Sequence, residues 1–366
     1  MTFDALSGGA HRGGQRLGRL ASPSPIVVGV VGVAITIYLV VASLAPVDFD
    51  MTLFIKTGTE PTAYRAQIEE LLGPVVLAPR LGHDGQAYFL LALDPLLIDQ
   101  DRFVVLDDPA YRAQRILYPA LVGFFGLLPP KVVVWTLVVV NIVAMGLGSV
   151  WTAGLAAHMG KSSWLGLSFA LNIGMISELR IDGGGIVAWA AAVAGLLALS
   201  RGRRATAAFW FLAAVLARET MMLVVAGAAF AEWRVRRPFR LIALVPLVSL
   251  FAWTGWVVVR LGLPQDALSQ NLGIPFAGLA AAVGGWRPVE VLVAASLFVA
   301  AWIIVGASVT RGGALALGSS GFVVLGCLLT GPIWGHFYDF SRAIAPILTS
   351  AVLLAAPARL PRQTHR

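Results

Sequence analysis

The chain contains a series of apolar segments, most of them long enough to cross a bilayer, since a spanning helix needs about 20 apolar residues. These segments are residues 25–46, 132–156, 164–178, 184–200, 207–231, 241–259, 288–308, 314–331 and 343–357. Hydrophobic residues make up 58% of the chain and charged residues only 13%, which is more apolar surface than a soluble protein of 366 residues can bury. We therefore predict an all-α polytopic membrane protein with a bundle of about 10 membrane helices.

Basic residues concentrate in two short loops, 201–204 (RGRR) and 234–240 (RVRRPFR), and in the N-terminal arm 1–24. Arginine-rich segments stay on the cytoplasmic side, so we place all three there. Both ends of segment 207–231 then lie on the same side, and the segment cannot cross the membrane once. We expect it to enter and return as a hairpin of two short helices with its tip at residues 218–220.

The apolar segments and the basic loops together define the rest of the chain as a single transmembrane domain, 25–357, followed by a cytoplasmic tail, 358–366. Lys161 and Arg311 are weaker markers of the cytoplasmic side. Arginine outnumbers lysine 24 to 3, which is typical of a GC-rich bacterial genome and predicts a bacterial inner-membrane protein. The formal charge of +8 is explained by this topology, and we expect no nucleic-acid partner because no basic run is interleaved with base-stacking aromatics.

The first extracytoplasmic loop, 47–131, is too long for a plain connector and is expected to fold on the membrane surface. Its segment 61–72 (PTAYRAQIEELL) has proline at a helix start and apolar residues at helical spacing, which predicts an amphipathic interfacial helix. Segment 116–128 is too short to span and contains proline, so we expect it to be re-entrant or interfacial. The fold prediction is therefore a helical bundle with a long external loop that carries amphipathic helices.

Residues 80–119 crowd acids, arginines and aromatics into the one long polar break between the apolar segments. Charges are costly in hydrocarbon, so we expect these side chains to line a water-filled recess on the outer face. Arginine forks match phosphate oxygens, and a carboxylate can take a proton from a hydroxyl. This combination predicts a site for an anionic lipid headgroup.

The sequence HDGQAYFLLALDP at 83–95, followed by YRAQRILYP at 111–119, resembles the GT-C superfamily of membrane glycosyltransferases. It looks closest to bacterial relatives whose loop reads aromatic-Asp-Gly-Gln-x-Tyr, and is more distantly similar to the mannosyltransferases of glycolipid-anchor assembly. Weaker similarities lie at 218–220 and at 338–346 (YDFSRAIAP). This chain departs from the pattern at His83, where the relatives have an aromatic residue.

The resemblance implies transfer of a mannose- or pentose-like sugar from a polyprenyl-phosphate donor to a glycan or lipid acceptor of the cell envelope, on the outer face. Asp84 matches the catalytic acid and would act as general base, with inversion at the sugar. Arg112 and Arg115, three apart and so on one side of a helical turn, would bind the donor phosphate. Arg218 and Arg342 would be further donor contacts.

Further positions follow from the same resemblance. Glu178 and Asp182, in SELRIDGG, resemble a second acidic motif that would hold the acceptor or a metal. The resemblance leaves the need for a divalent cation open. The supporting positions within the matched loop are His83, Gln86, Tyr88 and Tyr111.

Structural interpretations compete with the functional ones for the loop residues. Asp84 precedes Gly85 and could simply form a turn. Arg112 and Arg115 could reach lipid headgroups from the start of an interfacial segment. The pair 107–108 precedes a proline and is interpreted as a turn or helix cap.

Alternatives also exist for the other charged sites. Arg218 and Glu219 could neutralise each other, and His83 and His336 could join Asp84 and Asp339 around a metal. The run 183–185 lacks the strand and the Lys-Ser/Thr of a nucleotide loop, and predicts close helix packing instead.

Two other function classes remain alongside the transferase. One is a transporter or flippase of a lipid-linked or anionic solute, against which the sequence offers no inverted repeat. The other is a noncatalytic partner in a cell-envelope complex.

Overall fold

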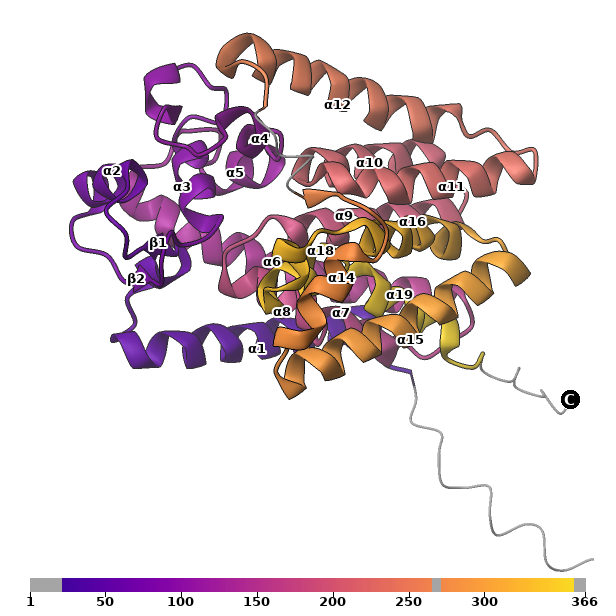
Figure 1. Ribbon diagram of the computed structural model, residues 1–366. Helices are drawn as coiled ribbons and strands as arrows, with labels where there is room; N and C mark the ends of the chain where they lie inside the picture. Colours follow the sequence, from indigo (N-terminus) through magenta and orange to yellow (C-terminus); the bar gives the residue numbers. More distant parts are fainter. Residues whose placement is uncertain (1–21, 265–270, 359–366) are drawn as a thin grey trace, which may run out of the picture.

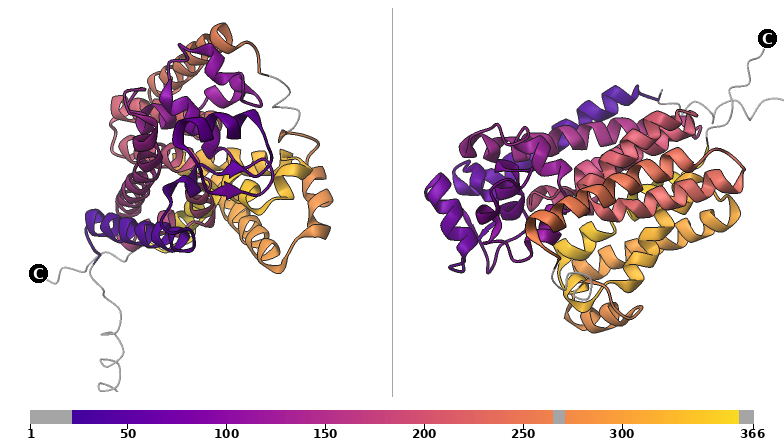
Figure 2. Two further views of the ribbon diagram at one scale, coloured as in Figure 1. Left: turned by 90° about the vertical axis from the view of Figure 1, so that its left-hand side faces the viewer. Right: turned by 90° about the horizontal axis from the view of Figure 1, so that it is seen from above.

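The computed structural model describes residues 22–264 and 271–358, and this part of the chain is mostly helical. The long helices run alongside one another, and the elements of the first loop gather at one end of them (Figure 1). Seen from above, this loop again caps one end of the helical bundle (Figure 2, right). Most of the predicted N-terminal arm, 1–24, and of the predicted tail, 358–366, lies outside the described residues.

Within the described residues, four helical segments are long and apolar enough to cross a membrane: Pro25–Val47, Pro130–His158 (α6), Arg240–Leu261 (α12) and Pro288–Thr310 (α15). The first contains α1 (Pro25–Leu44) and the 3-10 turn η1 (Ala45–Val47). A fifth candidate is the pair α18 (Phe337–Ala343) and α19 (Pro346–Ala355), bent by 51° at its break. Shorter apolar helices are α9 (Gly185–Ser200), α10 (Arg204–Ala217) and α16 (Ala314–Leu328). The chain is thus an all-α protein of multi-pass membrane type.

The helices differ in how far their apolar side chains are buried within the protein. Nearly every side chain of α9 is buried, including the large Trp189. On α12 and α15, by contrast, large apolar side chains such as Phe251, Val259 and Trp302 face outward, the last 81% exposed. Such surfaces are unfavourable in water and suit a hydrocarbon environment.

The basic loops lie together at the end of the bundle away from the first loop (Figure 1). Lys161 donates to the backbone carbonyl of Leu354, and Arg311 reaches the same carbonyl. Arg204, at the start of α10, pairs with Glu232 near the end of α11 at 3.0 Å. One end of the bundle therefore carries the loops that the sequence placed on one side.

Segment 207–231 has the predicted form of two short helices. Helix α10 ends at Ala217, the backbone is extended at Arg218, a 3-10 turn (η5, Glu219–Met221) follows, and α11 covers Met222–Arg234. Because Arg204 and Glu232 join the far ends of the two arms, the segment returns to the side from which it started. The predicted hairpin with a tip at 218–220 is confirmed.

The predicted continuous helix 164–178 is wrong. The chain forms a 3-10 turn (η4, Ser163–Gly166), a short helix α7 (Leu167–Ala170) and a separate helix α8 (Ile173–Arg180). Asn172 causes the break, because its side-chain oxygen accepts from the backbone of Gly174 and caps α8. Its amide nitrogen donates to the carbonyl of Ala345, which ties the break to α19.

The first loop is built from short elements. They are η2 (Met51–Phe54), β1 (Thr57–Gly58), α2 (Ala63–Leu72), β2 (Leu77–Ala78), α3 (Gly85–Leu93), η3 (Gln100–Phe103), α4 (Pro109–Ala113) and α5 (Leu117–Val122). The two strands pair in parallel. The predicted helix 61–72 begins two residues later than expected, because Thr62 accepts from the backbone of Arg65 and caps α2. The short α5 lies within predicted segment 116–128 and ends well before Pro129.

Helix α12 fastens the first loop to the bundle. Trp253 donates its indole hydrogen to the carbonyl of Ala113, just after Arg112 in α4. Trp256 and Arg260 donate to carbonyls of the segment 96–98. The remaining short elements are α14 (Ala277–Ala282), η6 (Val283–Gly285) and α17 (Gly331–Trp334). The left view of Figure 2 looks onto the end of the bundle that carries the first loop.

Candidate functional site

A cavity of about 1210 Å³ lies where the first loop meets the helix ends. Elements far apart in the chain form its wall: α3 and α4 of the loop, the tip of the α10–α11 hairpin, the end of α16 and α18. The charged side chains that line it include Asp84, Asp107, Arg112, Arg115, Arg218, Glu219, Asp339 and Arg342. The structure thus brings together the predicted base and all four predicted phosphate-binding arginines.

Asp84 sits between two guanidinium groups. One carboxylate oxygen accepts from Arg112 Nη1 at 2.5 Å and the other accepts from Arg342 Nη1 at 2.5 Å. These partners are 28 and 258 positions away in the chain. The side chain of Asp84, 9% exposed, caps no helix, although it immediately precedes α3. Asp84 does stand in a turn before α3, but its side chain also joins two arginines from distant parts of the chain.

Gly85 sets the position of Asp84. A Cβ atom at Gly85 would lie 2.6 Å from the backbone oxygen of Phe54 and 2.7 Å from that of Ile55. Only glycine allows the start of α3 to approach the loop backbone this closely. The neighbouring His83 is held by a backbone bond to the carbonyl of Lys56 at 3.1 Å.

Each of the two guanidinium groups also binds a second acid. Arg112 grips Asp107 with two bonds of 3.0 and 2.8 Å, and Arg342 binds Asp339, one helical turn earlier, at 2.8 Å. We call Asp84, Asp107, Arg112, Asp339 and Arg342 the cavity cluster. Its three acids outnumber its two arginines, so the cluster carries no spare positive charge.

Electrostatics fix the protonation states around Asp84. Burial acts to raise the pKa of this carboxyl, but the guanidinium groups of Arg342 and Arg112 together hold it well below its usual range. Asp84 is therefore ionised at neutral pH. Burial, assisted by Arg342, lowers the pKa of His83 below 6.5, so this imidazole is neutral at pH 7.

Arg115 belongs to a separate ion pair. It binds both oxygens of Glu219 at 3.0 and 2.8 Å and donates to the hydroxyl of Tyr111 at 2.6 Å. Arg112 and Arg115 were predicted to lie on one side of the same helical turn. This prediction is wrong, because α4 ends at Ala113 and Arg115 lies beyond it. Both arginines line the cavity, but they hold different acids.

Arg218 lines the cavity and pairs with Glu178, which does not line it. Glu178 is 1% exposed, accepts from Arg218 Nη1 and also accepts from the backbone of Gly185 at 3.3 Å. A Cβ atom at Gly183 would lie 1.6 Å from Oε2 of Glu178. The predicted close packing at the glycine run therefore has a specific purpose, which is to make room for this carboxylate.

Asp182 is equally buried. Its Oδ1 accepts from the hydroxyl of Tyr118 at 2.5 Å and from the amide of Asn141 at 2.9 Å. We call Glu178, Arg218, Asp182, Tyr118 and Asn141 the wall cluster. Neither of its acids lines the cavity. Protein donors bind Glu178 and the Oδ1 atom of Asp182, whereas Oδ2 of Asp182 is buried without a hydrogen-bond partner. Because neither acid lines the cavity, the geometry does not fit the expected role of holding an acceptor there.

The supporting positions divide between cavity and core. Gln86 and Tyr111 line the cavity, and the Gln86 amide donates to the carbonyl of Leu81 at 2.7 Å. His83 lines it as well. Tyr88 does not, because it is buried with its ring edge-on to Tyr118, with centroids 5.3 Å apart.

The remaining interpretations can be compared with the contacts. Asp108 accepts from the backbone of Tyr111 at 3.0 Å, which confirms it as the cap of α4. Asp107 was expected to do the same, but binds Arg112 instead. Arg218 and Glu219 do not neutralise each other, since each pairs with a residue from another element.

No group of three or more His, Cys, Asp or Glu side chains that could hold a metal occurs within residues 22–264 and 271–358. The carboxylates of Asp84 and Asp339, which were considered with His83 and His336, point to arginines. The donor set of the cavity therefore suits an anion.

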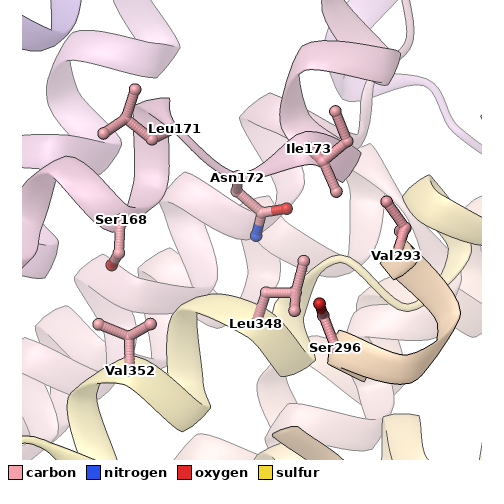
Figure 3. A pocket seen from close by; sticks show the side chains of 8 residues that line it. All are labelled: Ser168, Leu171, Asn172, Ile173, Val293, Ser296, Leu348 and Val352. Carbon is pink, nitrogen blue, oxygen red and sulfur yellow. The ribbon is translucent and has the colours of Figure 1, made fainter. Parts of the chain in front are cut away.

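A second hollow of about 310 Å³ lies between the α7–α8 break, α15 and α19 (Figure 3). Its lining is Ser168, Leu171, Asn172, Ile173, Val293, Ser296, Leu348 and Val352. None of these side chains ionises, and both ends of the Asn172 amide are bonded within the protein. This pocket offers no acid or base that could activate the hydroxyls of Ser168 and Ser296, so the candidate site is the larger cavity.

Comparison of the chain with protein-family models, curated proteins and solved structures finds no match. The functional argument therefore depends on the contacts within the cavity.

Proposed function

We propose that the chain is a membrane glycosyltransferase. It moves a mannose- or pentose-like sugar from a polyprenyl-phosphate donor to a glycan or lipid acceptor of the cell envelope. The observation that carries this proposal is the position of Asp84 in the cavity between Arg112 and Arg342. A carboxylate can deprotonate a hydroxyl, and two guanidinium groups beside it can bind a phosphate.

The shape and chemistry of the cavity support an amphiphilic substrate. Besides its charged residues, the lining includes the apolar side chains of Leu272, Leu325, Leu329 and Ile333. An isoprenoid chain can lie against such side chains while its phosphate meets the arginines. A soluble sugar nucleotide has no group that would use the apolar part.

The proposed reaction is a single displacement. Asp84 accepts the proton of the acceptor hydroxyl, whose oxygen forms a bond to the anomeric carbon of the sugar. The bond from this carbon to the phosphate oxygen breaks with its electron pair, and the lipid phosphate leaves with its charge balanced by arginine. Because attack and departure occur on opposite faces, the configuration inverts.

The orientation of the protein follows from its charge distribution. The basic loops lie at the end away from the first loop, and arginine-rich loops favour the cytoplasm. We therefore place the termini in the cytoplasm and the cavity on the outer face of a bacterial inner membrane. Lipid-linked sugars displayed on that face would enter the cavity directly.

Sugar transfer by membranes containing the wild type or Asp84→Asn tests the proposal, with radiolabelled polyprenyl-phosphate sugars as donors and a lipid extract as acceptor. A general base contributes about 10²–10⁴-fold, so transfer should fall by that factor. Asp101→Asn is the matched control, because Asp101 is exposed and does not line the cavity. Transfer that persists in Asp84→Asn at equal expression would remove Asp84 from the chemistry. Absence of transfer by the wild type with every donor would contradict the transferase proposal.

A further inference from the structure

We propose that Asp84 occupies the donor phosphate's place in the substrate-free protein. The donor binds by displacing Asp84 from Arg112 and Arg342, and this displacement releases Asp84 to act as the base. The inference rests on the proposed function and deepens it, because it assigns the phosphate subsite to one arginine pair and makes the base dependent on the donor.

The first support is the geometry of the two contacts. Arg112 and Arg342 approach different oxygens of Asp84, each at 2.5 Å. Guanidinium groups bind carboxylate and phosphate oxygens in the same way. An anion with two accessible oxygens can therefore take the place of Asp84 without a change in the arginine side chains.

The second support is that both arginines have another anchor. Arg112 keeps its two bonds to Asp107, and Arg342 keeps its bond to Asp339, when Asp84 moves away. These anchors hold the guanidinium groups in the direction of the cavity. Asp107 and Asp339 are thus positioning residues for the phosphate subsite.

The third support is charge. The cavity cluster already has three carboxylates for two arginines, so an added phosphate is repelled while Asp84 keeps its contacts. Once the guanidinium groups bind the phosphate, Asp84 loses the interactions that hold its pKa low. It then becomes a stronger proton acceptor at the moment when the donor is in place.

Two other arginines of the cavity lining, Arg218 and Arg115, are less suited to such an exchange. Arg218 holds Glu178, which is buried behind the wall and would be left without its cationic partner. Arg115 binds both oxygens of Glu219 and has Tyr111 stacked 4.8 Å away, with no second acid to hold it. Only Arg112 and Arg342 share one acid and keep another.

Binding of farnesyl phosphate to the purified full-length protein in detergent tests the inference, with farnesol as the uncharged control. Asp84→Asn should bind farnesyl phosphate about tenfold more tightly than the wild type, although it loses sugar transfer. A base that does not compete with the phosphate would give no such gain. Arg342→Gln in the Asp84→Asn background should abolish the gain.

Glu60→Gln is the control for loss of negative charge in general. Glu60 lies on the cavity lining and forms no ion pair with either arginine of the cluster. Its substitution should leave the affinity for farnesyl phosphate within about twofold. Equal gains in Glu60→Gln and Asp84→Asn would overturn the inference.

The outcomes separate the inference from the proposed function. If the wild type binds farnesyl phosphate and Asp84→Asn binds it equally or more weakly, the displacement is wrong but the transferase proposal survives. If no protein distinguishes farnesyl phosphate from farnesol, the lipid-phosphate donor is wrong and both proposals fail.

A measurement on the wild type keeps the inference testable if Asp84→Asn does not fold. As the pH is lowered, the transfer rate at saturating donor should begin to fall at a higher pH than the rate at limiting donor. The rate at saturating donor reports the pKa of the base in the donor complex, whereas the rate at limiting donor reports the pKa of the base in the free protein. The charged or titratable groups that face Asp84 are Arg342, Arg112, Arg115, His83 and Tyr88. Coincident acid limbs in the two profiles would contradict a release of Asp84 by the donor.

Discussion

The cavity cluster and the wall cluster are built from the same kinds of side chain, but they differ in what can replace their bonds. In the cavity cluster, each arginine is shared between two acids, and Asp107 has a side chain that is 59% exposed. In the wall cluster, Glu178 and Asp182 are buried and every partner belongs to the protein. The cavity cluster can therefore exchange an acid for a ligand, whereas the wall cluster can only keep its internal bonds or lose them.

The comparison teaches that an acid–arginine pair in a membrane protein is informative only together with its surroundings. Breaking a buried pair leaves an uncompensated charge, so the wall cluster should govern stability. Exchanging a partner at a cavity surface keeps both arginines paired with an anion, so the cavity cluster should govern binding and catalysis. The predictions below test this division, beginning with the largest effect.

Glu178→Gln should destabilise the protein by about 3–5 kcal/mol, because it leaves Arg218 without its acid in the wall. The measurement is thermal unfolding in detergent together with the yield of monodisperse protein. Asp107→Asn, which removes an acid of the same charge from the exposed part of the cavity cluster, is the comparison. Equal losses of stability in both variants would break the distinction between the clusters.

Gly85→Ala should cost about 1–3 kcal/mol, because its Cβ atom would collide with the backbone oxygens of Phe54 and Ile55. The resulting shift of α3 moves Asp84, so transfer per folded molecule should also fall. Gly73→Ala provides a second glycine of the same loop, whose Cβ atom would meet no neighbour but whose φ of 84° adds backbone strain. A loss of stability in Gly85→Ala with full transfer would show that Asp84 is positioned by something else.

Arg342→Lys should reduce transfer by about tenfold, the equivalent of about 1.4 kcal/mol. Lysine keeps the charge but not the fork that binds Asp84 and Asp339 at the same time. Steady-state rates at varied donor concentration would place the loss in the apparent donor affinity. Arg102→Lys, a substitution in the weaker loop pair with Asp99, should leave transfer unchanged.

His83 should produce the smallest effect, which is a pH dependence of stability. Its pKa is lowered in the folded protein, first by burial and then by Arg342, so the unfolded chain binds the proton more readily. The contribution of neutral His83 to the stability of the fold is complete above about pH 6.5. It is lost as the pH falls from there through the pKa of His83 in the folded protein. His83→Gln should therefore reduce the fall in stability between pH 7.5 and pH 5.5 by less than about 1.4 kcal/mol. An identical dependence of stability on pH in the wild type and the variant would contradict the environment assigned to His83.

Much of the helical arrangement could be predicted from apolar segment length. Segments such as 132–156 and 288–308 became α6 and α15 because an uninterrupted apolar run can satisfy its backbone only as a helix in a membrane. The hairpin at 207–231 followed from the charge of its flanks. The segment 164–178 failed because one side chain, Asn172, caps a new helix through contacts that apolarity does not register.

The candidate site was predicted in part. The loop pattern identified Asp84, and the similarity at 338–346 led to Arg342, so both members of one pair were named. Asp107 and Asp339 were not recognised as their anchors, because such pairings arise only when distant segments fold together. Sequence alone also could not tell that Glu178 and Asp182 do not line the cavity, since an acid near a helix end gives the same sequence pattern in either position.

The most direct test of the division between the clusters compares Asp84→Asn with Asp182→Asn. Both substitutions replace a buried carboxylate with an amide, but one lies in the cavity and the other behind it. The measurement is the sugar-transfer rate per folded molecule, with the folded fraction determined by monodisperse elution. We expect Asp84→Asn to lose about 10²–10⁴-fold and Asp182→Asn to keep transfer close to the wild type despite reduced stability. Persistent transfer in Asp84→Asn, or an equal loss in folded Asp182→Asn, would contradict the assignment of the chemistry to the cavity cluster.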